Sequence, residues 1–387
     1  MTGQANTYRI VGSGPVALAC ALFMVRGGID PRRVHLSLPA VGPKPMPGGT
    51  VAGQSLRRML ALSDGSRQLL CRIIGAMPPG GIIDCIEVAI SGRSGRTRIQ
   101  ARDFDVAALG YVIAYPELVT ALRAAVERMP FAADAPSALQ ATPSARPSVT
   151  IHAEGLPPPS GRSSDISSRD FDQTALLTEA IAEHGGTTAY ECFGENGPLA
   201  LLPADPGYSP RYAVVWCDRP AASVARAALS PAQLSAALDR AVASFSLPKH
   251  ALGKLRVCAP VQSAPLRRLR RVDGAKGSEV WIGNAAQALH PVAGQGLNLG
   301  LRDAFELARS LADNEYAKQP TAAEEMLSRF AAARRFDRRI TTGITDSLAA
   351  AFTWPLARPL QSALLNTMDL LPAVRRPLAR TLLFGQR

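Results

Sequence analysis

The pattern of apolar and polar residues near the start of the chain predicts a strand, a turn and a helix. Residues 8–11 form a short, mostly apolar run, and a loop with Gly12 and Gly14 follows it. Apolar residues then continue from Ala17 to position 25 and stop at a Gly-Gly pair, a common helix end. Residues 34–38 form a second strand pattern. Together these patterns predict a strand–helix–strand unit that holds a pyrophosphate at the helix N-terminus.

A second strand–loop–helix pattern lies far downstream. The apolar run 280–282 leads into Gly283, and a glycine loop at 294–296 precedes a run with helical spacing. The apolar members of that run are Leu297, Leu301, Ala304, Phe305, Ala308 and Leu311. A helix start after such a loop presents backbone N–H groups and the positive end of a dipole to an anion. Taken alone, this pattern is as typical of an ordinary helix start as of a cofactor site.

The middle of the chain has the short apolar runs and turns of a β-sheet. We expect paired strands over 82–90 and 97–100, and a β-rich segment that opens at 169–177 and continues through 187–193, 197–203 and 212–216. Helices are expected over 116–126 and over 231–245, where Ser230 suits an N-cap and Pro231 the first helical position. The Pro- and Ala-rich stretch 130–168 predicts a surface connection, and residues after 328 form a helical pattern.

Composition places the chain among ordinary globular proteins. Its 387 residues can bury a large core in two or three domains, with 47% hydrophobic and 19% charged residues. No apolar run is long enough to span a membrane, and no secretory signal is recognisable. The six cysteines lack a Cys-x-x-Cys pair and predict reduced thiols in a cytosolic protein. The histidines are scattered, so we expect no metal site.

The net charge of +12 leaves more than one interpretation open. Nucleic acid is disfavoured because the arginines form no basic run interleaved with aromatic residues. An anionic membrane surface or an acidic cofactor fits better, and simple surface decoration fits as well. Residues 329–387 contain ten Arg and three Asp without Lys or Glu, so this end carries +7 of the total. With its interspersed Leu, Trp and Met, it predicts a basic amphipathic region for a bilayer, for a partner or for its own domain.

The residues from 283 to 303 narrow the interpretation. They read Gly-Asn-Ala-Ala-Gln-Ala-Leu-His-Pro-Val-Ala-Gly-Gln-Gly-Leu-Asn-Leu-Gly-Leu-Arg-Asp. This stretch resembles the second flavin-binding motif of FAD-dependent aromatic hydroxylases, the class A flavoprotein monooxygenases, and is most similar to that of the ubiquinone-biosynthesis hydroxylases. The glycine loop at 12–17, far upstream, matches the split flavin site of that family. The Gly-Pro-Leu-Ala-Leu-Leu-Pro run at 197–203 resembles its substrate-domain sheet.

The resemblance implies an α/β fold with a Rossmann-like FAD-binding domain, an inserted β-sheet substrate domain and a helical C-terminal region. It divides the chain into a discontinuous FAD-binding domain at 1–71, 101–165 and 266–328. The substrate domain would comprise 72–100 and 166–265, with the basic helical region at 329–387. In that sheet Asp172 and Gln173 are candidate polar residues of a substrate pocket, although a solvated strand end is the more ordinary interpretation.

The resemblance also assigns site residues. His290 and Pro291 would border the edge of the flavin that reacts with oxygen, and the other assigned residues would bind the cofactor. The cofactor-binding set is Gly12, Gly14, Ala17, Arg58, Gly283, Asn284, Gly294, Gly296, Leu297 and Asn298. The N–H groups of Leu297 and Asn298 would stabilise the anionic pyrimidine end of the reduced flavin. Arg58 also fits a surface arginine before a helix, and His290 also fits a structural role.

Two positions depart from the family pattern. Ser37 stands where a carboxylate usually ends the second strand and holds the ribose hydroxyls. The strand that usually ends in Asp-Gly is represented by residues 151–155, with Glu154 before Gly155. Either Glu154 replaces the aspartate or the motif has decayed, and the Pro-rich run that follows favours decay.

The family chemistry predicts an FAD-dependent monooxygenase that uses O₂ and a transiently bound NAD(P)H, because no second dinucleotide motif is present. The Gly-Asn-Ala-Ala-Gln form of the motif resembles the hydroxylase that acts on 2-polyprenyl-6-methoxyphenol, so the expected substrate is a polyprenylated phenol of ubiquinone biosynthesis. The expected location is cytoplasmic and peripheral at the inner membrane, with other ubiquinone-biosynthesis proteins as partners. The alternative is a catalytically impaired family member that acts as a structural subunit of that assembly.

Overall fold

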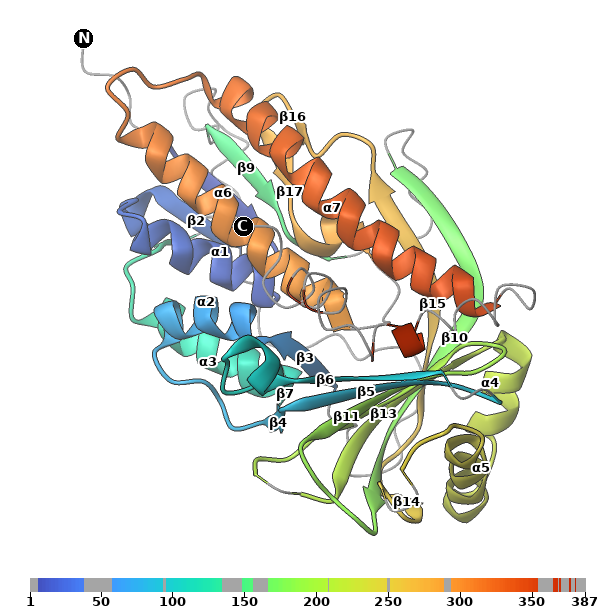
Figure 1. Ribbon diagram of the computed structural model, residues 1–387. Helices are drawn as coiled ribbons and strands as arrows, with labels where there is room; N and C mark the ends of the chain where they lie inside the picture. Colours follow the sequence, from blue (N-terminus) through green and yellow to red (C-terminus); the bar gives the residue numbers. More distant parts are fainter. Residues whose placement is uncertain are drawn as a thin grey trace.

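The computed structural model describes residues 6–37, 58–92, 95–133, 148–155, 166–207, 209–248, 251–288 and 294–353, together with 365–367, 369, 376 and 380. Within these residues it contains three β-sheets flanked by helices (Figure 1). The first sheet and its helices form the upper part of the view in Figure 1, and the largest sheet forms the lower part.

The first sheet has six strands in the order β16 (Ala275–Lys276), β17 (Glu279–Trp281), β9 (Val149–His152), β1 (Tyr8–Val11), β2 (Val34–Ser37) and β8 (Ala132–Ala133). From β17 to β8 all neighbours are parallel. Helices α1 (Pro15–Arg26) and α6 (Gln295–Glu315) pack against each other and bury one apolar face of the sheet. The predicted strand–helix–strand unit is therefore confirmed, because β1 and β2 run parallel with α1 between them.

The second sheet follows the order β18 (Gln287–Ala288), β15 (Gln262–Arg271), β10 (Ile166–Ala182), β13 (Arg211–Asp218), β12 (Pro198–Pro203), β11 (Thr188–Phe193), β5 (Cys85–Ile90) and β6 (Arg96–Gln100). A ninth strand, β14 (Leu255–Val257), pairs with β10. Helices α4 (Pro220–Ala227) and α5 (Pro231–Ala243) lie on its outer side, away from the first sheet (Figure 1). The predicted N-cap is confirmed, since Ser230 and Gln233 form a capping box at α5.

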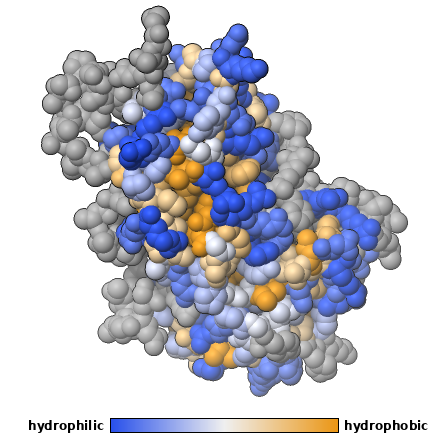
Figure 2. Space-filling model, turned by 90° about the vertical axis from the view of Figure 1, so that its left-hand side faces the viewer, coloured by the Kyte–Doolittle hydropathy of each residue, from blue (hydrophilic) through white to orange (hydrophobic). Residues whose placement is uncertain are grey.

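A small third sheet connects the other two. Its order is β3 (Met59–Ser63), β7 (Gly110–Ala114) and β4 (Gly81–Ile83), and it is flanked by α2 (Asp64–Ile74) and α3 (Tyr115–Glu127). The carbonyl oxygen of Pro203 in β12 would lie 2.0 Å from a Cβ at Gly81, so only glycine allows this contact between sheets. Figure 2 shows the side of the molecule that carries α1, α2 and α3, where apolar side chains form a band between hydrophilic ones.

The C-terminal part begins with the long helix α7 (Ala323–Thr353), which packs on α6 and on β16 and β17. Farther along, Leu365 is buried against Ile90 and Phe193 of the second sheet. Asn366 and Asp369 accept hydrogen bonds from the backbone N–H groups of Arg96 and Arg98 on the edge strand β6. Residues 329–387 were expected to contact a bilayer, a partner or their own chain. The described residues of this region show the last of these, contact with the chain's own sheets.

Three of the predicted domain limits fall inside continuous elements. The limits at residues 71, 265 and 328 lie within α2, β15 and α7. The division of the chain into domains stays a prediction. No helix among the described residues is long and apolar enough to cross a membrane. All six cysteines are described and none forms a disulfide; four of them are buried.

Candidate cofactor site and its surroundings

The N-terminus of α1 is built for a close backbone approach. Gly12 has φ of +132°, and a Cβ there would lie 2.5 Å from the carbonyl oxygen of Ala153, just beyond β9. Only glycine avoids both the left-handed strain and this clash. Gly14 is the N-cap of α1, and its carbonyl accepts the first helical hydrogen bond, from the N–H of Leu18 at 3.1 Å. The N–H groups of the first turn, including that of Ala17, point out of the helix end, where the dipole favours an anion.

The start of α6 reaches the same place. Val16 of α1 would lie 3.2 Å from a Cβ at Gly283 and 2.8 Å from one at Gly300. The loop after β17 and the second turn of α6 therefore both contact the first turn of α1. Gly294, the N-cap of α6, has φ of +58°, and a Cβ there would lie 2.9 Å from the side chain of Ala61 in β3. The two glycine loops predicted far apart in sequence thus come together at one pair of helix N-termini.

Gly296 lies in the first turn of α6 beside open space. A Cβ at this position would meet no heavy atom closer than the Oδ1 of Asn284, at 4.0 Å. The backbone N–H groups of Gly296 and Leu297 belong to the first turn and have no acceptor within the helix. The site can therefore accept a flat, partly anionic group against this backbone, which is what an FAD pyrimidine ring requires.

The side chain of Asn298 is bonded to the protein backbone and does not face a ligand. Its Oδ1 accepts the N–H of Ser63 at 2.9 Å, and its Nδ2 donates to the carbonyls of Ala61 and Gly294 at 3.1 and 2.9 Å. Asn298 is buried, and its side-chain amide links α6 to β3 through the kind of hydrogen bonds that a neighbouring strand would make. Because these bonds use the side chain, Asn298 positions the loop, and only its backbone remains a candidate for direct contact.

Arg58 lies at the open side of the α1 N-terminus. Its guanidinium lies 5.3 Å from the ring centroid of Tyr115, a cation–π contact, and its carbonyl accepts the Tyr115 N–H at 2.7 Å. The Tyr115 hydroxyl in turn would be 3.8 Å from a Cβ at Gly14. Arg58 therefore stands near the predicted pyrophosphate position. Tyr115 was not foreseen, since a tyrosine at a helix start carries no signal in the sequence.

The strand around Glu154 is intact. Residues 149–152 form β9, which pairs in parallel with both β1 and β17, and Gly155 follows with φ of +94°. The backbone of this central strand is complete and brings Glu154 to the end of the sheet beside Gly12, and whether Glu154 replaces the aspartate or the motif has decayed in function stays a prediction. Partial burial acts to raise the pKa of Glu154, but the contact with His152 and the charge of Arg271 outweigh it and lower the pKa.

Of the remaining predicted residues, the structure describes some and not others. Ser37 ends β2 opposite Val11, which is the strand end where a ribose-binding carboxylate was expected. His290 and Pro291 lie outside the described residues, so their assignment stays a prediction. Of the two candidate pocket residues, Asp172 is exposed, while Gln173 is buried and donates from Nε2 to the carbonyl of Asn196 at 2.7 Å. The solvated interpretation is therefore right for Asp172 and wrong for Gln173.

Beneath the loop lies a buried charge cluster that the sequence did not reveal. Asp303 of α6 is fully buried and accepts Arg334 Nε at 2.8 Å and Arg338 Nη2 at 2.9 Å, both from α7. It also accepts the N–H of Gly283 at 3.4 Å. Burial alone would raise the pKa of Asp303, but the two guanidinium groups hold it below its ordinary value. The cluster ties α7 to the flavin motif, so two of the arginines counted toward a basic surface lie inside the protein.

Comparison with known proteins agrees with this geometry. Residues 156–339 match the FAD binding domain family known as FAD_binding_3. The ubiquinone hydroxylase UbiL of Rhodospirillum rubrum is 32% identical over 189 residues, which are 48% of this chain and 42% of that protein. The 3-demethoxyubiquinol 3-hydroxylase of Escherichia coli K12 is 27% identical over 186 residues, 47% of this chain and 44% of that protein. Over about half of its length, the chain is thus similar in sequence to proteins named as ubiquinone hydroxylases.

The matches span less than half the length of each of these two relatives. The similarity of fold covers more of the chain than these matches do. The crystal structure of p-nitrophenol 4-monooxygenase PnpA from Pseudomonas putida DLL-E4 superposes with a TM-score of 0.70, covering 99% of both chains at 15% identity. The predicted α/β FAD-binding fold with a helical C-terminal region is therefore confirmed.

Proposed function

We propose that this protein is an FAD-dependent monooxygenase that hydroxylates a polyprenylated phenol in ubiquinone biosynthesis, with O₂ as the oxygen source and NAD(P)H as a transient reductant. The observation that carries the proposal is the meeting of two helix N-termini beside Gly296, with open space at the exposed backbone. The names of the matched ubiquinone hydroxylases support the reaction class. The pyrophosphate would lie at α1, and the flavin ring at α6.

FAD, when bound, would supply the redox chemistry of oxygen transfer, and the chain would supply position, charge and dryness. The N–H groups of Gly296 and Leu297 would hold negative charge on the ring at the α6 N-terminus. Arg58, beside Tyr115, would neutralise the pyrophosphate. We further propose that His290 and Pro291 border the reacting edge. The inner face of the second sheet would exclude water from the phenol ring.

The test is a spectrum followed by a turnover experiment. Purified protein titrated with FAD is expected to give a bound-flavin visible spectrum at one FAD per chain. Mixed with NADH or NADPH, O₂ and a short-chain prenylated 2-methoxyphenol, it should release a product that is heavier by one oxygen atom. A protein that binds FAD but forms no hydroxylated product from any prenylated phenol contradicts the proposed reaction.

A second candidate is a structural subunit that retains the fold without catalysis. It is favoured by Ser37 at the end of β2, because loss of one charge-assisted hydrogen bond to the ribose weakens FAD binding by roughly ten- to a hundred-fold. Under this candidate, Ser37→Glu would restore tight FAD binding without restoring turnover. Under the enzyme proposal, the wild type turns over and Ser37→Glu only lowers the FAD concentration it needs.

Peripheral association with an anionic membrane is also part of the proposal, because the substrate class is lipid. Each exposed arginine near such a surface contributes about 1 kcal/mol, which falls with salt. Co-sedimentation with anionic and neutral liposomes across a salt series tests it. Arg376→Gln with Arg380→Gln should weaken salt-sensitive binding to anionic vesicles. Equal binding by wild type and variant, or none by either, contradicts membrane association.

A further inference from the structure

The two faces of the nine-stranded sheet are covered differently. The face under α4 and α5 is closed, with Leu176, Cys192 and Trp216 buried in its core. Strand alternation places the neighbours of these residues on the opposite face. That face is turned toward the third sheet, since Ala189 packs there with Ile83 and Val112.

One row of side chains crosses the centre of this inner face. The strand registers pair Leu177 with Val215, Val215 with Ala200, Ala200 with Glu191, and Glu191 with Val88. The row therefore runs across β10, β13, β12, β11 and β5. It places one carboxylate, Glu191, among four apolar side chains.

The rows on this face differ in accessibility, although Ile86 and Leu202 of one neighbouring row are also partly exposed. All five residues of the central row are partly exposed, although they lie in the middle of the sheet. On one side Ala189 is buried against the third sheet, and on the other Phe193 and Ile90 are buried under Leu365. The row is thus a solvent-accessible strip between two packed clusters, and the small side chain of Ala200 leaves room beside the carboxylate.

We propose that Glu191 is the residue that binds the phenol hydroxyl of the substrate; this inference rests on the proposed hydroxylase function. Glu191 is a partly exposed carboxylate whose neighbours in the row are apolar, so a ligand that combines an O–H donor with an apolar body matches both features of the strip. A prenylated phenol has this form, with one O–H donor on a ring that would lie beside Val88 and Ala200, the neighbours of Glu191 in the row, and a prenyl chain that would extend over Val215 and Leu177. A carboxylate has about four acceptor sites, so Glu191 can serve a protein partner and the phenol together.

The same contact explains how the ring becomes reactive. When the phenol O–H bond breaks, its proton would pass to a carboxylate oxygen of Glu191 and its electron pair would stay on the phenol oxygen, which makes the ring carbons more electron-rich. This step transfers a proton only. In the proposed reaction O₂ is the oxidant, NAD(P)H and the ring each supply two electrons, and the second oxygen atom leaves as water. Glu191 would thereby also fix which end of the ring points to the sheet.

The test compares a prenylated 2-methoxyphenol with its O-methyl ether, which cannot donate. Affinities for the FAD-loaded protein are measured by calorimetry for wild type, Glu191→Gln and Glu191→Leu. Wild type should prefer the phenol, and Glu191→Leu should lose roughly ten- to a hundred-fold of phenol affinity while its affinity for the ether is unchanged. Bound flavin content reports that each variant is folded.

Glu87→Gln is the matched control. Glu87 lies on the adjacent strand β5, paired in register with Tyr190, and so belongs to the face covered by α5. It should keep the wild-type preference. If Glu191→Leu keeps that preference, or if Glu87→Gln loses it equally, the assignment of Glu191 is wrong. A wild type that prefers the phenol but forms no product contradicts the proposed function while leaving the binding role of Glu191 in place.

Discussion

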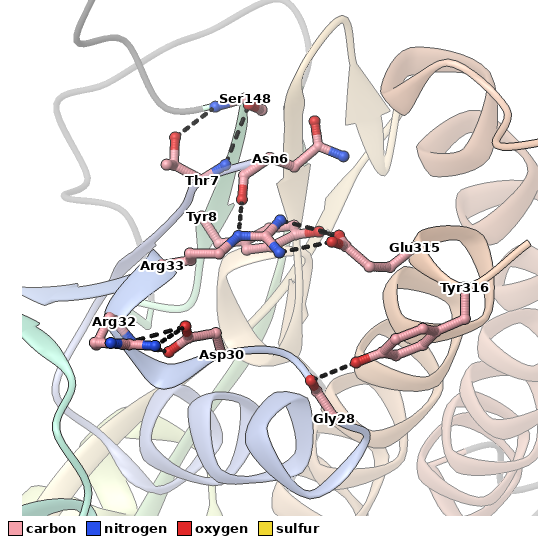
Figure 3. A network of polar contacts seen from close by, with 10 residues as sticks. All are labelled: Asn6, Thr7, Tyr8, Gly28, Asp30, Arg32, Arg33, Ser148, Glu315 and Tyr316. Atoms are coloured by element: carbon pink, nitrogen blue, oxygen red, sulfur yellow. Dashed lines mark hydrogen bonds and ion pairs between the residues drawn. The ribbon is translucent and has the colours of Figure 1, made fainter. Parts of the chain in front are cut away.

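The two ends of helix α6 use the same kinds of polar group for different purposes. Each end carries an asparagine that holds a backbone segment: Asn298 binds Ser63 and Ala61, and Asn314 binds both the N–H and the carbonyl of Thr321. At the C-terminal end Glu315 also accepts Arg33 Nη1 at 2.6 Å and the Tyr8 hydroxyl at 2.9 Å (Figure 3). Next to it, Tyr316 donates to the carbonyl of Gly28 at 2.6 Å.

The two ends differ in whether donor groups face open space. Figure 3 shows Arg33 and Tyr8 directed at Glu315, and all three side chains are hydrogen-bonded within the protein. At the N-terminal end the asparagine is used in the same way, but the first-turn backbone at Gly296 faces open space. A satisfied network stabilises the fold, whereas exposed donors beside open space bind a ligand. The following substitutions separate these two roles.

The largest effect on stability is expected between the two ends, at Asp303. Asp303→Asn leaves Arg334 and Arg338 buried with a weakened partner, and breaking such a pair costs about 3–5 kcal/mol. Chemical denaturation measures this loss. Glu306→Gln, in the same helix, removes only a surface pair with Arg309 and should cost less than about 1 kcal/mol. Similar losses for both variants would show that the buried cluster does not hold α7 to the flavin motif.

Asn298→Ala should have the next largest effect. It leaves the buried N–H of Ser63 and the half-buried carbonyl of Ala61 without this partner, at a cost of about 1–3 kcal/mol for each unsatisfied group. FAD affinity should fall as well, because the Gly294 loop loses its attachment to β3. Asn314→Ala is the matched variant at the other end and should lose stability with unchanged FAD affinity. Equal losses of FAD affinity at both ends would remove the distinction between them.

Gly296→Ala should change the free energy of unfolding and the FAD affinity in opposite directions. Its Cβ meets no atom closer than the Oδ1 of Asn284 at 4.0 Å, and alanine is favoured over glycine in a helix, so the protein without FAD should gain about 0.5–1 kcal/mol. The same methyl group would stand between the flavin and the backbone and lower FAD affinity about ten-fold or more. Thermal unfolding and FAD titration measure the two effects. An unchanged FAD affinity places the ring elsewhere.

The smallest effect is expected for Glu315→Gln. The hydrogen bond from Arg33 outweighs desolvation and lowers the pKa of Glu315. A lowered pKa means that the contribution is complete above the unfolded value of about 4.3 and is lost as pH falls through the folded value. The variant should lose about 1 kcal/mol at neutral pH, and the difference from wild type should vanish in acid. A difference that persists below that window would rule out the ion pair as its source.

The sequence predicted those features that local patterns encode. The strand–helix–strand unit, the start of α6 and the cap of α5 each depend on glycine, capping or apolar spacing within a few residues. It could not predict Asp303 with Arg334 and Arg338, because their pairing depends on the packing of α7 on α6. The sequence could not predict the role of Glu191 either, because only the strand register shows that its neighbours in the row are apolar. At Glu154 the changed residue suggested decay, while the backbone of β9 is complete.

Hydrogen exchange with and without FAD tests the central claim most directly. The amides of residues 12–17 and 294–298 should exchange more slowly when FAD is present, because the cofactor would accept hydrogen bonds from both helix N-termini. The amides of residues 312–316, at the closed end of α6, should change little. Protection that is absent from 294–298, or equal at both ends of α6, would contradict the assignment of the flavin to this helix start.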